Sequence, residues 1–176
     1  MKTTLSNMMQ KEQKSDYLKD ILSQSLKVIA PKDGEQISMD KSQVLLKVTS
    51  EMTQDQFGIY QVELAPKSVG ADLHYHRFME EVFVVISGNL TLTTMDTQHI
   101  AIPGTLVHIP KFTVHGFRND SDETVKALIF FNPSMGREGF FKGLKQVLER
   151  KPFDPNLFAG LYNKYDSVPY QGGMER

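Results

Sequence analysis

The sequence predicts an all-β fold with helices at the two ends of the chain. Between residues 43 and 133 the chain consists of short runs rich in Val, Ile, Phe, Leu and Thr, separated by Gly, Pro, Asn and Asp. Runs at this spacing are typical of a β-sandwich or barrel. After Pro133 the apolar residues recur at helical intervals instead.

Each strand is expected where an apolar run lies between turn residues. Ser87-Gly88-Asn89 separates two runs and Ile102-Pro103-Gly104 separates two more, which supports their assignment as strands. The expected strands cover residues 44–49, 58–64, 73–75, 82–86, 90–95, 99–102, 106–109 and 125–131.

The run over residues 82–86 is apolar on both faces of its strand. A strand with one solvated face would alternate apolar and polar residues, so the outer face of this strand must be covered. The N-terminal segment, a C-terminal helix or a second copy of the chain could cover it. We expect a homodimer in which at least one of these contributes.

Helical patterns flank the strand-rich region. Asp154 and Pro155 form an N-cap and first-turn signal for the last of the expected helices. We therefore divide the chain into an N-terminal extension (1–42), a β-barrel (43–133) and a C-terminal helical extension (134–176). The apolar stripes are Tyr17, Leu18, Ile21, Leu22 and Leu26 before the barrel, and Phe140, Phe141, Leu144, Val147 and Leu148, then Leu157, Phe158, Leu161, Tyr162 and Tyr165, after it.

Composition excludes several classes of function. The 20 basic and 21 acidic residues are interspersed, and a net charge of -1 argues against nucleic acid as a partner. No stretch approaches the ~20 apolar residues that a membrane span needs, and no signal-peptide core begins the chain. We expect a cytoplasmic protein with no membrane partner. Because the chain has no cysteine, any metal site must use nitrogen and oxygen ligands.

His74 and His76 are the first candidate metal ligands. Residues two apart in a strand point to the same face, so the two imidazoles can aim at one point. An H-x-H pair alone is more often a pair of surface histidines, but Glu81 and His115 add two further candidate ligands. Three histidines and a carboxylate suit one divalent transition metal ion, Fe, Mn, Ni, Cu or Zn.

The spacing of these residues resembles that of the cupin family. In the first cupin motif, H-x-H is followed after four residues by Glu and after six more by Gly, as His76, Glu81 and Gly88 are here. The second motif matches Gly104, Pro110, His115 and Asn119. The resemblance implies a double-stranded β-helix, a small jelly-roll barrel, that binds the metal through His74, His76, Glu81 and His115.

Phe112 departs from the second motif, which has glycine at this position. We expect an altered turn there, because glycine serves turns that need a permissive backbone. Three other polar residues lie near the motifs without belonging to them. Glu80 is expected to be solvated or ion-paired, His99 to lie on the surface, and His108 to pack in an ordinary way although it could line the cavity rim.

Two classes of function remain open. The ligand set resembles that of the quercetin 2,3-dioxygenase-like cupins, which implies an oxidoreductase acting on a small organic substrate, with Glu81 as general base. The alternative is a non-catalytic module that binds a small molecule or metal, or a cupin isomerase. The candidate apolar walls of a substrate pocket, each of which could equally be core, are Met79, Phe83, Phe112 and Phe117.

Overall fold

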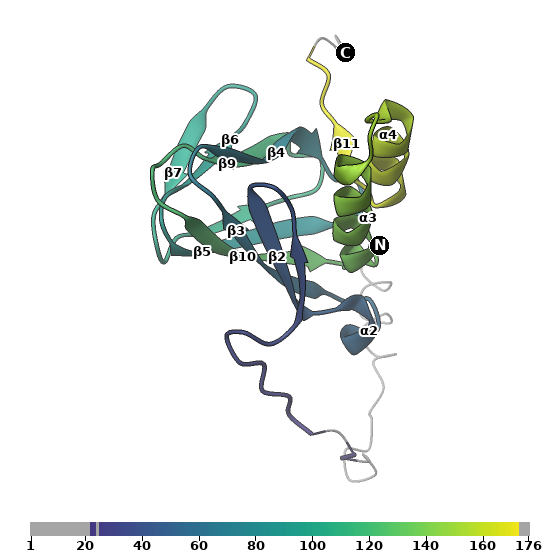
Figure 1. Ribbon diagram of the computed structural model, residues 1–176. Helices are drawn as coiled ribbons and strands as arrows, with labels where there is room; N and C mark the ends of the chain where they lie inside the picture. Colours follow the sequence, from purple (N-terminus) through teal and green to yellow (C-terminus); the bar gives the residue numbers. More distant parts are fainter. Residues whose placement is uncertain (1–21, 24, 173–176) are drawn as a thin grey trace, which may run out of the picture.

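The chain folds into two antiparallel sheets that face each other, with two helices at one end (Figure 1). The computed structural model describes residues 22, 23 and 25–172. One sheet has the strand order β1 (Glu35–Ser38), β2 (Ser42–Val48), β3 (Gly58–Leu64), β10 (Val125–Asn132), β5 (Glu80–Ser87) and β8 (Leu106–Ile109). The other has the order β11 (Val168–Pro169), β4 (Ser68–Tyr75), β9 (His115–Asn119), β6 (Leu90–Thr93) and β7 (Gln98–Ala101). This arrangement confirms the predicted all-β jelly roll with C-terminal helices.

Alternating burial along the strands builds the core. In β3 and β10 every second residue is buried, so their inward side chains pack between the sheets while the outward ones are half-buried. Tyr60, Phe83 and Phe131 are each at most 1% exposed and provide the largest buried rings. Their burial between the sheets contributes to the hydrophobic stabilisation of the barrel.

The helices close one end of the barrel. A single turn, α2 (Ser50–Thr53), joins β2 to β3, and α3 (Arg137–Glu149) and α4 (Pro155–Lys164) follow β10. Phe140 and Phe141 on α3 are buried in the same core as the strands. Asp154 caps α4 as predicted, since its carboxylate accepts hydrogen bonds from the amides of Asn156 at 3.0 Å and Leu157 at 3.3 Å.

The N-terminal region differs from expectation. Tyr17, Leu18 and Ile21 lie outside the described residues, whereas Leu22 and Leu26 are described, belong to no helix and are 93% and 84% exposed. Residues 35–38 lie in the segment 30–40, which the sequence predicts as a loop or an entry strand, and they form β1, which pairs with β2. The short-range sequence pattern does not show whether this segment is a strand. Hydrogen bonding to the neighbouring strand decides that it is.

The outer face of β5 is only half covered within one chain. Val82 and Val84 are partly buried and Ile86 is 44% exposed. The homodimer therefore stays a prediction. In the part of the chain that the structure describes, no helix is long and apolar enough to cross a membrane.

Candidate metal centre

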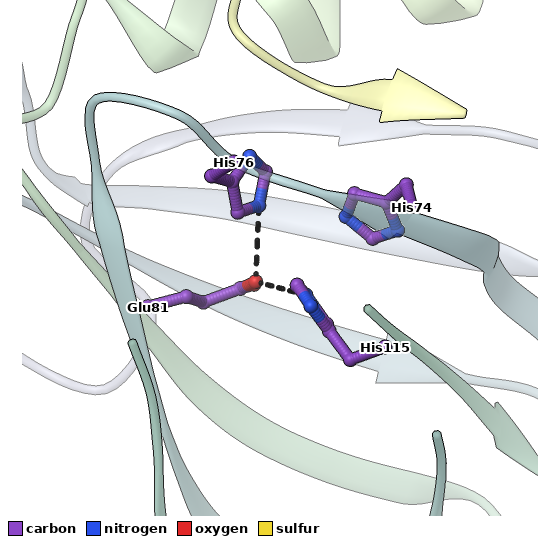
Figure 2. Close-up of side chains that lie close together, drawn as sticks. All are labelled: His74, His76, Glu81 and His115. Atoms are coloured by element: carbon purple, nitrogen blue, oxygen red, sulfur yellow. Dashed lines mark hydrogen bonds and ion pairs between the residues drawn. The ribbon is translucent and has the colours of Figure 1, made fainter. Parts of the chain in front are cut away.

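The three histidines and Glu81 meet inside the barrel, where their ligand atoms all lie within 4.8 Å of one another (Figure 2). His74 lies on β4, His76 just after it, Glu81 at the start of β5 and His115 at the start of β9. All four are buried, at 2–4% exposure. The two sheets thus each contribute ligands to one point between them.

Each imidazole is oriented by a backbone carbonyl. A carbonyl oxygen can only accept, so the Nδ1 atom that it contacts must carry the hydrogen, and the other ring nitrogen, Nε2, is left for the centre of the site. Such bonds fix both the tautomer and the ring plane of a metal-binding histidine. The pairs are His74 with Asp72 at 2.8 Å, His76 with Asp166 at 2.5 Å and His115 with Thr113 at 2.9 Å.

Glu81 lies between two of these rings. Its Oε2 is 2.8 Å from Nε2 of His115 and 3.3 Å from Nε2 of His76, as the dashed lines in Figure 2 show. Burial alone raises the pKa of Glu81, but the contacts with His115 and His76 outweigh it and hold that pKa below its usual range. Burial likewise lowers the pKa of His115, but Glu81 outweighs it and raises that pKa above 6.5.

His74 completes the site in its neutral form. Burial, with the charge of His115 adding to it, lowers the pKa of His74 to about 3. A neutral imidazole is the form that binds a metal.

The donor set fits a divalent transition metal ion. Bonds of ~2.0–2.2 Å place opposite ligands on one ion about 4 Å apart, close to the observed spread of ligand atoms. His115 uses its Nδ1 proton to bond with the carbonyl of Thr113, so without a metal its contact with Glu81 needs a second proton on Nε2. A cation bound at Nε2 would replace that second proton. It would neutralise a carboxylate whose burial is otherwise costly. The residues present therefore suit the ion that the sequence implies, and the set does not distinguish among Fe, Mn, Ni, Cu and Zn.

Asp166, which the sequence analysis missed, fastens the C-terminal segment to this site. Its buried carboxylate accepts hydrogen bonds from the backbone amides of Arg77, Phe78 and Met79 at 2.7–3.3 Å. Its carbonyl orients His76, and β11, which follows, pairs with β4 beside His74. No local signal could identify Asp166, because its partners lie at least 87 positions away in the chain.

A cavity of about 110 Å³ adjoins the candidate metal ligands His74 and Glu81. Of the predicted pocket residues, Phe117 lines it. Phe83 packs edge-on against Phe117 with ring centroids 5.0 Å apart, and Met79 is fully buried without lining the cavity. Arg137, at the start of α3, also lines the cavity and is a further residue that sequence reasoning missed.

A second, open hollow of about 560 Å³ lies between β7 and β8 and reaches His115. Most of the surface of this hollow is apolar, and His108 is one of the residues that line it. His108 is exposed and lines this hollow, which was the alternative to the ordinary packing expected for it. It contacts Glu80 at 2.9 Å, in agreement with the expected ion-paired role of Glu80. His99 is exposed, as expected.

Phe112 retains the backbone conformation that glycine favours. Its φ is 63°, and its amide donates a 2.7 Å hydrogen bond to the carbonyl of His76. We expected a different turn here; instead the chain carries a large side chain in a left-handed conformation, at a cost of about 1–2 kcal/mol. The Phe112 side chain is 68% exposed and does not reach the inner cavity.

Comparison with known proteins supports the same fold and motifs. Residues 60–131 match the family model described as the cupin domain. A stretch of 52 residues is 42% identical to quercetin 2,3-dioxygenase of Bacillus subtilis (strain 168), but it covers only 29% of this chain and 15% of that protein.

Two solved structures share the fold at low sequence identity. The polyketide cyclase RemF from Streptomyces resistomycificus superposes with a TM-score of 0.54 at 20% identity, over 61% of this chain and 80% of that chain. A predicted oxalate decarboxylase from Thermotoga maritima gives 0.55 at 15% identity, over 61% and 99%. At such identities the likeness concerns the fold alone.

Proposed function

We propose that this chain, whose residues 60–131 form a domain of the cupin superfamily, is a mononuclear metal-dependent oxidoreductase of the dioxygenase type that acts on a small organic substrate. One observation carries the proposal: three imidazoles, each held by a backbone carbonyl, aim their Nε2 atoms at a point beside Glu81 and next to a cavity. The partial identity with quercetin 2,3-dioxygenase supports the dioxygenase class.

The chain supplies orientation, exclusion of water and a proton acceptor. When bound, the ion would supply Lewis-acid chemistry and, if it is redox-active, electron transfer with oxygen. The apolar walls around Phe117, Phe131 and Phe140 reduce the contact of a substrate in the cavity with water. His74, His76 and His115 hold their ring planes through bonds to the backbone, so their geometry is set before a ligand arrives.

Glu81 is the proposed general base. Both of its contacts use Oε2, so among the described residues Oε1 has no hydrogen-bond partner and can accept a proton. The lowered pKa of Glu81 makes it a weak base. It would take a proton only from a substrate group whose acidity the bound cation has increased.

The test combines metal analysis with oxygen uptake. Protein purified without chelator is expected to hold about one transition metal ion per chain, and oxygen consumption is then measured with small hydroxy ketones, diketones and thiols, with flavonols as larger candidates. Substrate-dependent uptake supports the proposal. Full metal occupancy with no uptake from any candidate would contradict it and favour the non-catalytic binding module.

Matched variants locate the metal in the predicted site. We expect His76→Ala and His115→Ala each to abolish tight metal binding, because each removes a ligand. Glu80→Ala is the control, since Glu80 neighbours Glu81 in the chain but pairs with His108 instead of facing the cluster. Stoichiometric metal retained in His76→Ala would contradict the assignment.

A further inference from the structure

Arg137 is a buried cation on the wall of the inner cavity. Its side chain is 4% exposed and lies over the rings of Phe131 at 4.4 Å and Phe140 at 4.0 Å. Its Nη1 donates to the carbonyl of Tyr165 at 2.9 Å and to the hydroxyl of Ser167 at 2.8 Å. Neither acceptor carries a charge, so the guanidinium has no carboxylate bound to it among the described residues.

One nitrogen of this guanidinium is unsatisfied. Nε of Arg137 is buried and has no hydrogen-bond partner in the part of the chain that the structure describes. Buried polar groups are nearly always paired, and a buried charge without a counter-ion is costly. Burial lowers the pKa of Arg137 to about 10, which still leaves it charged at neutral pH.

The charges around the cavity favour an anion. His74 and Glu81 line the same cavity as Arg137. In the apo chain the negative charge of Glu81 offsets that of Arg137. With a divalent cation bound by neutral imidazoles, the charges of the cation, Glu81 and Arg137 would sum to two positive charges beside the cavity.

The size of the cavity restricts the ligand. Its volume is about 110 Å³, and its remaining walls are mainly apolar. An engineered cavity of ~150 Å³ in another protein takes up one benzene molecule. A multi-ring compound such as a flavonol exceeds this volume, whereas a short-chain carboxylate fits within it.

We propose that the inner cavity binds a small monocarboxylate, with the carboxylate held by Arg137 and the short apolar body held against the phenylalanine walls. This inference rests on the proposed function and names its substrate class. It assigns Arg137, which lies on α3 outside the matched cupin domain, as the residue that selects for negative charge. Ser167 and Tyr165 position Arg137 through its Nη1.

The test measures binding to zinc-loaded protein, because zinc has no redox chemistry and turnover then cannot interfere. Calorimetric titrations compare propanoate with propionamide, a neutral molecule of nearly the same shape. We expect propanoate to bind at least about 10-fold more tightly, as a charge-assisted hydrogen bond provides. Benzoate serves as a size probe and is expected to bind more weakly than propanoate.

Variants then separate Arg137 from the metal. Arg137→Gln is expected to weaken propanoate binding about 10-fold or more and to leave propionamide unchanged, while Arg137→Lys retains part of the preference. Ser167→Ala keeps the guanidinium but removes one of the two acceptors that position it, so it is expected to weaken propanoate binding by less than Arg137→Gln does. Arg118→Gln, at a half-buried arginine that pairs with Asp120 outside the cavity, is the matched control.

Two outcomes would overturn the inference. Equal affinity of the wild-type protein for propanoate and propionamide is one, and it can be observed even if Arg137→Gln does not fold. The other is propanoate binding that requires zinc but is unchanged in Arg137→Gln, which would place the anion on the metal alone. Neither outcome depends on oxygen uptake, so a failure here is distinguishable from a failure of the proposed oxidoreductase activity.

Discussion

Asp166 provides the sharpest test of how the C-terminal segment supports the metal centre. Replacing it in Asp166→Ala removes the acceptor for the backbone amides of Arg77, Phe78 and Met79. Each buried donor left without a partner costs about 1–3 kcal/mol. Phe78 is 55% exposed, so water can reach part of this turn, and we take the low end of the range for each amide.

The expected loss of unfolding free energy is therefore about 3 kcal/mol. For a chain of 150–250 residues 1 kcal/mol corresponds to about 2–4 °C, so the melting temperature should fall by roughly 6–12 °C. Asp166 also has a φ of 54°, which Asp and Asn tolerate better than Ala does. Asp166→Asn keeps that tolerance and one acceptor oxygen, and it should lose less stability.

Metal affinity should fall with the same change. Asp166→Ala keeps the backbone carbonyl that orients His76, but it removes the carboxylate that holds the turn joining His76 to Glu81. Loss of such an outer contact weakens metal binding about 10–100-fold. Scanning calorimetry measures the stability, and competition with a chromogenic chelator measures the affinity.

Asp154→Ala is the matched control for this experiment. Asp154 also accepts backbone amides in the C-terminal region, but it caps an exposed helix end far from the ligands in the chain. It should cost about 1 kcal/mol and leave metal affinity unchanged. The reasoning is refuted if Asp166→Ala loses no more stability than Asp154→Ala and binds the metal as tightly as wild type.

The remaining predictions concern pH, metal removal, turn glycines and assembly. In the apo protein the contact with Glu81 raises the pKa of His115 above 6.5, so metal binding must displace a proton. Metal affinity should therefore rise with pH, and it should fall about tenfold per pH unit below that raised pKa. A constant metal affinity between pH 5 and 8 would contradict this prediction. Chelation should lower the melting temperature by roughly 5–11 °C relative to protein at 100-fold excess of metal over Kd, reversibly on reloading, with His115→Ala showing no such shift. In urea denaturation, Gly88→Ala should lower the free energy of unfolding more than Gly104→Ala does. Both glycines have a positive φ, but a Cβ at Gly88 would meet a backbone carbonyl oxygen at 2.8 Å, whereas a Cβ at Gly104 would meet nothing within 4 Å. Equal losses of unfolding free energy would show that this contact does not matter. The half-covered apolar face of β5 predicts a homodimer in sedimentation experiments, which Val84→Glu should convert to a monomer; a monomeric wild-type protein would rule out this role for the face.

The local sequence was sufficient for much of the barrel and for the ligand set. Alternation along β3 and β10, and turn glycines such as Gly88, are short-range properties, so they predict strands without knowledge of the partner strand. His74, His76 and Glu81 lie within eight consecutive residues, and their spacing is tied to the pleat of the strands that carry them. The N-cap at Asp154 was predictable for the same reason, because its partners are two and three residues away.

Other features depend on contacts between distant parts of the chain. The segment His115–Asn119 has weak strand propensity, with Gly116 inside it, and becomes β9 because it pairs with both β4 and β6. Whether Phe112 would alter its turn was likewise decided by the surrounding structure, which holds it at a positive φ. Strand propensity alone cannot predict such pairing, because hydrogen bonds to neighbouring strands outweigh the propensity of the segment itself.

The sequence by itself determined the barrel, its four candidate metal ligands and the nitrogen and oxygen donors that they offer. Only the tertiary structure decided that Asp166 fastens the turn between His76 and Glu81, that Arg137 lines the cavity, and that this cavity is small. The physical reason is the separation along the chain between the residues that make each contact. Periodicity and motif spacing record contacts over a few residues, whereas the shape and charge of a cavity are set where strands and helices far apart in the chain pack together.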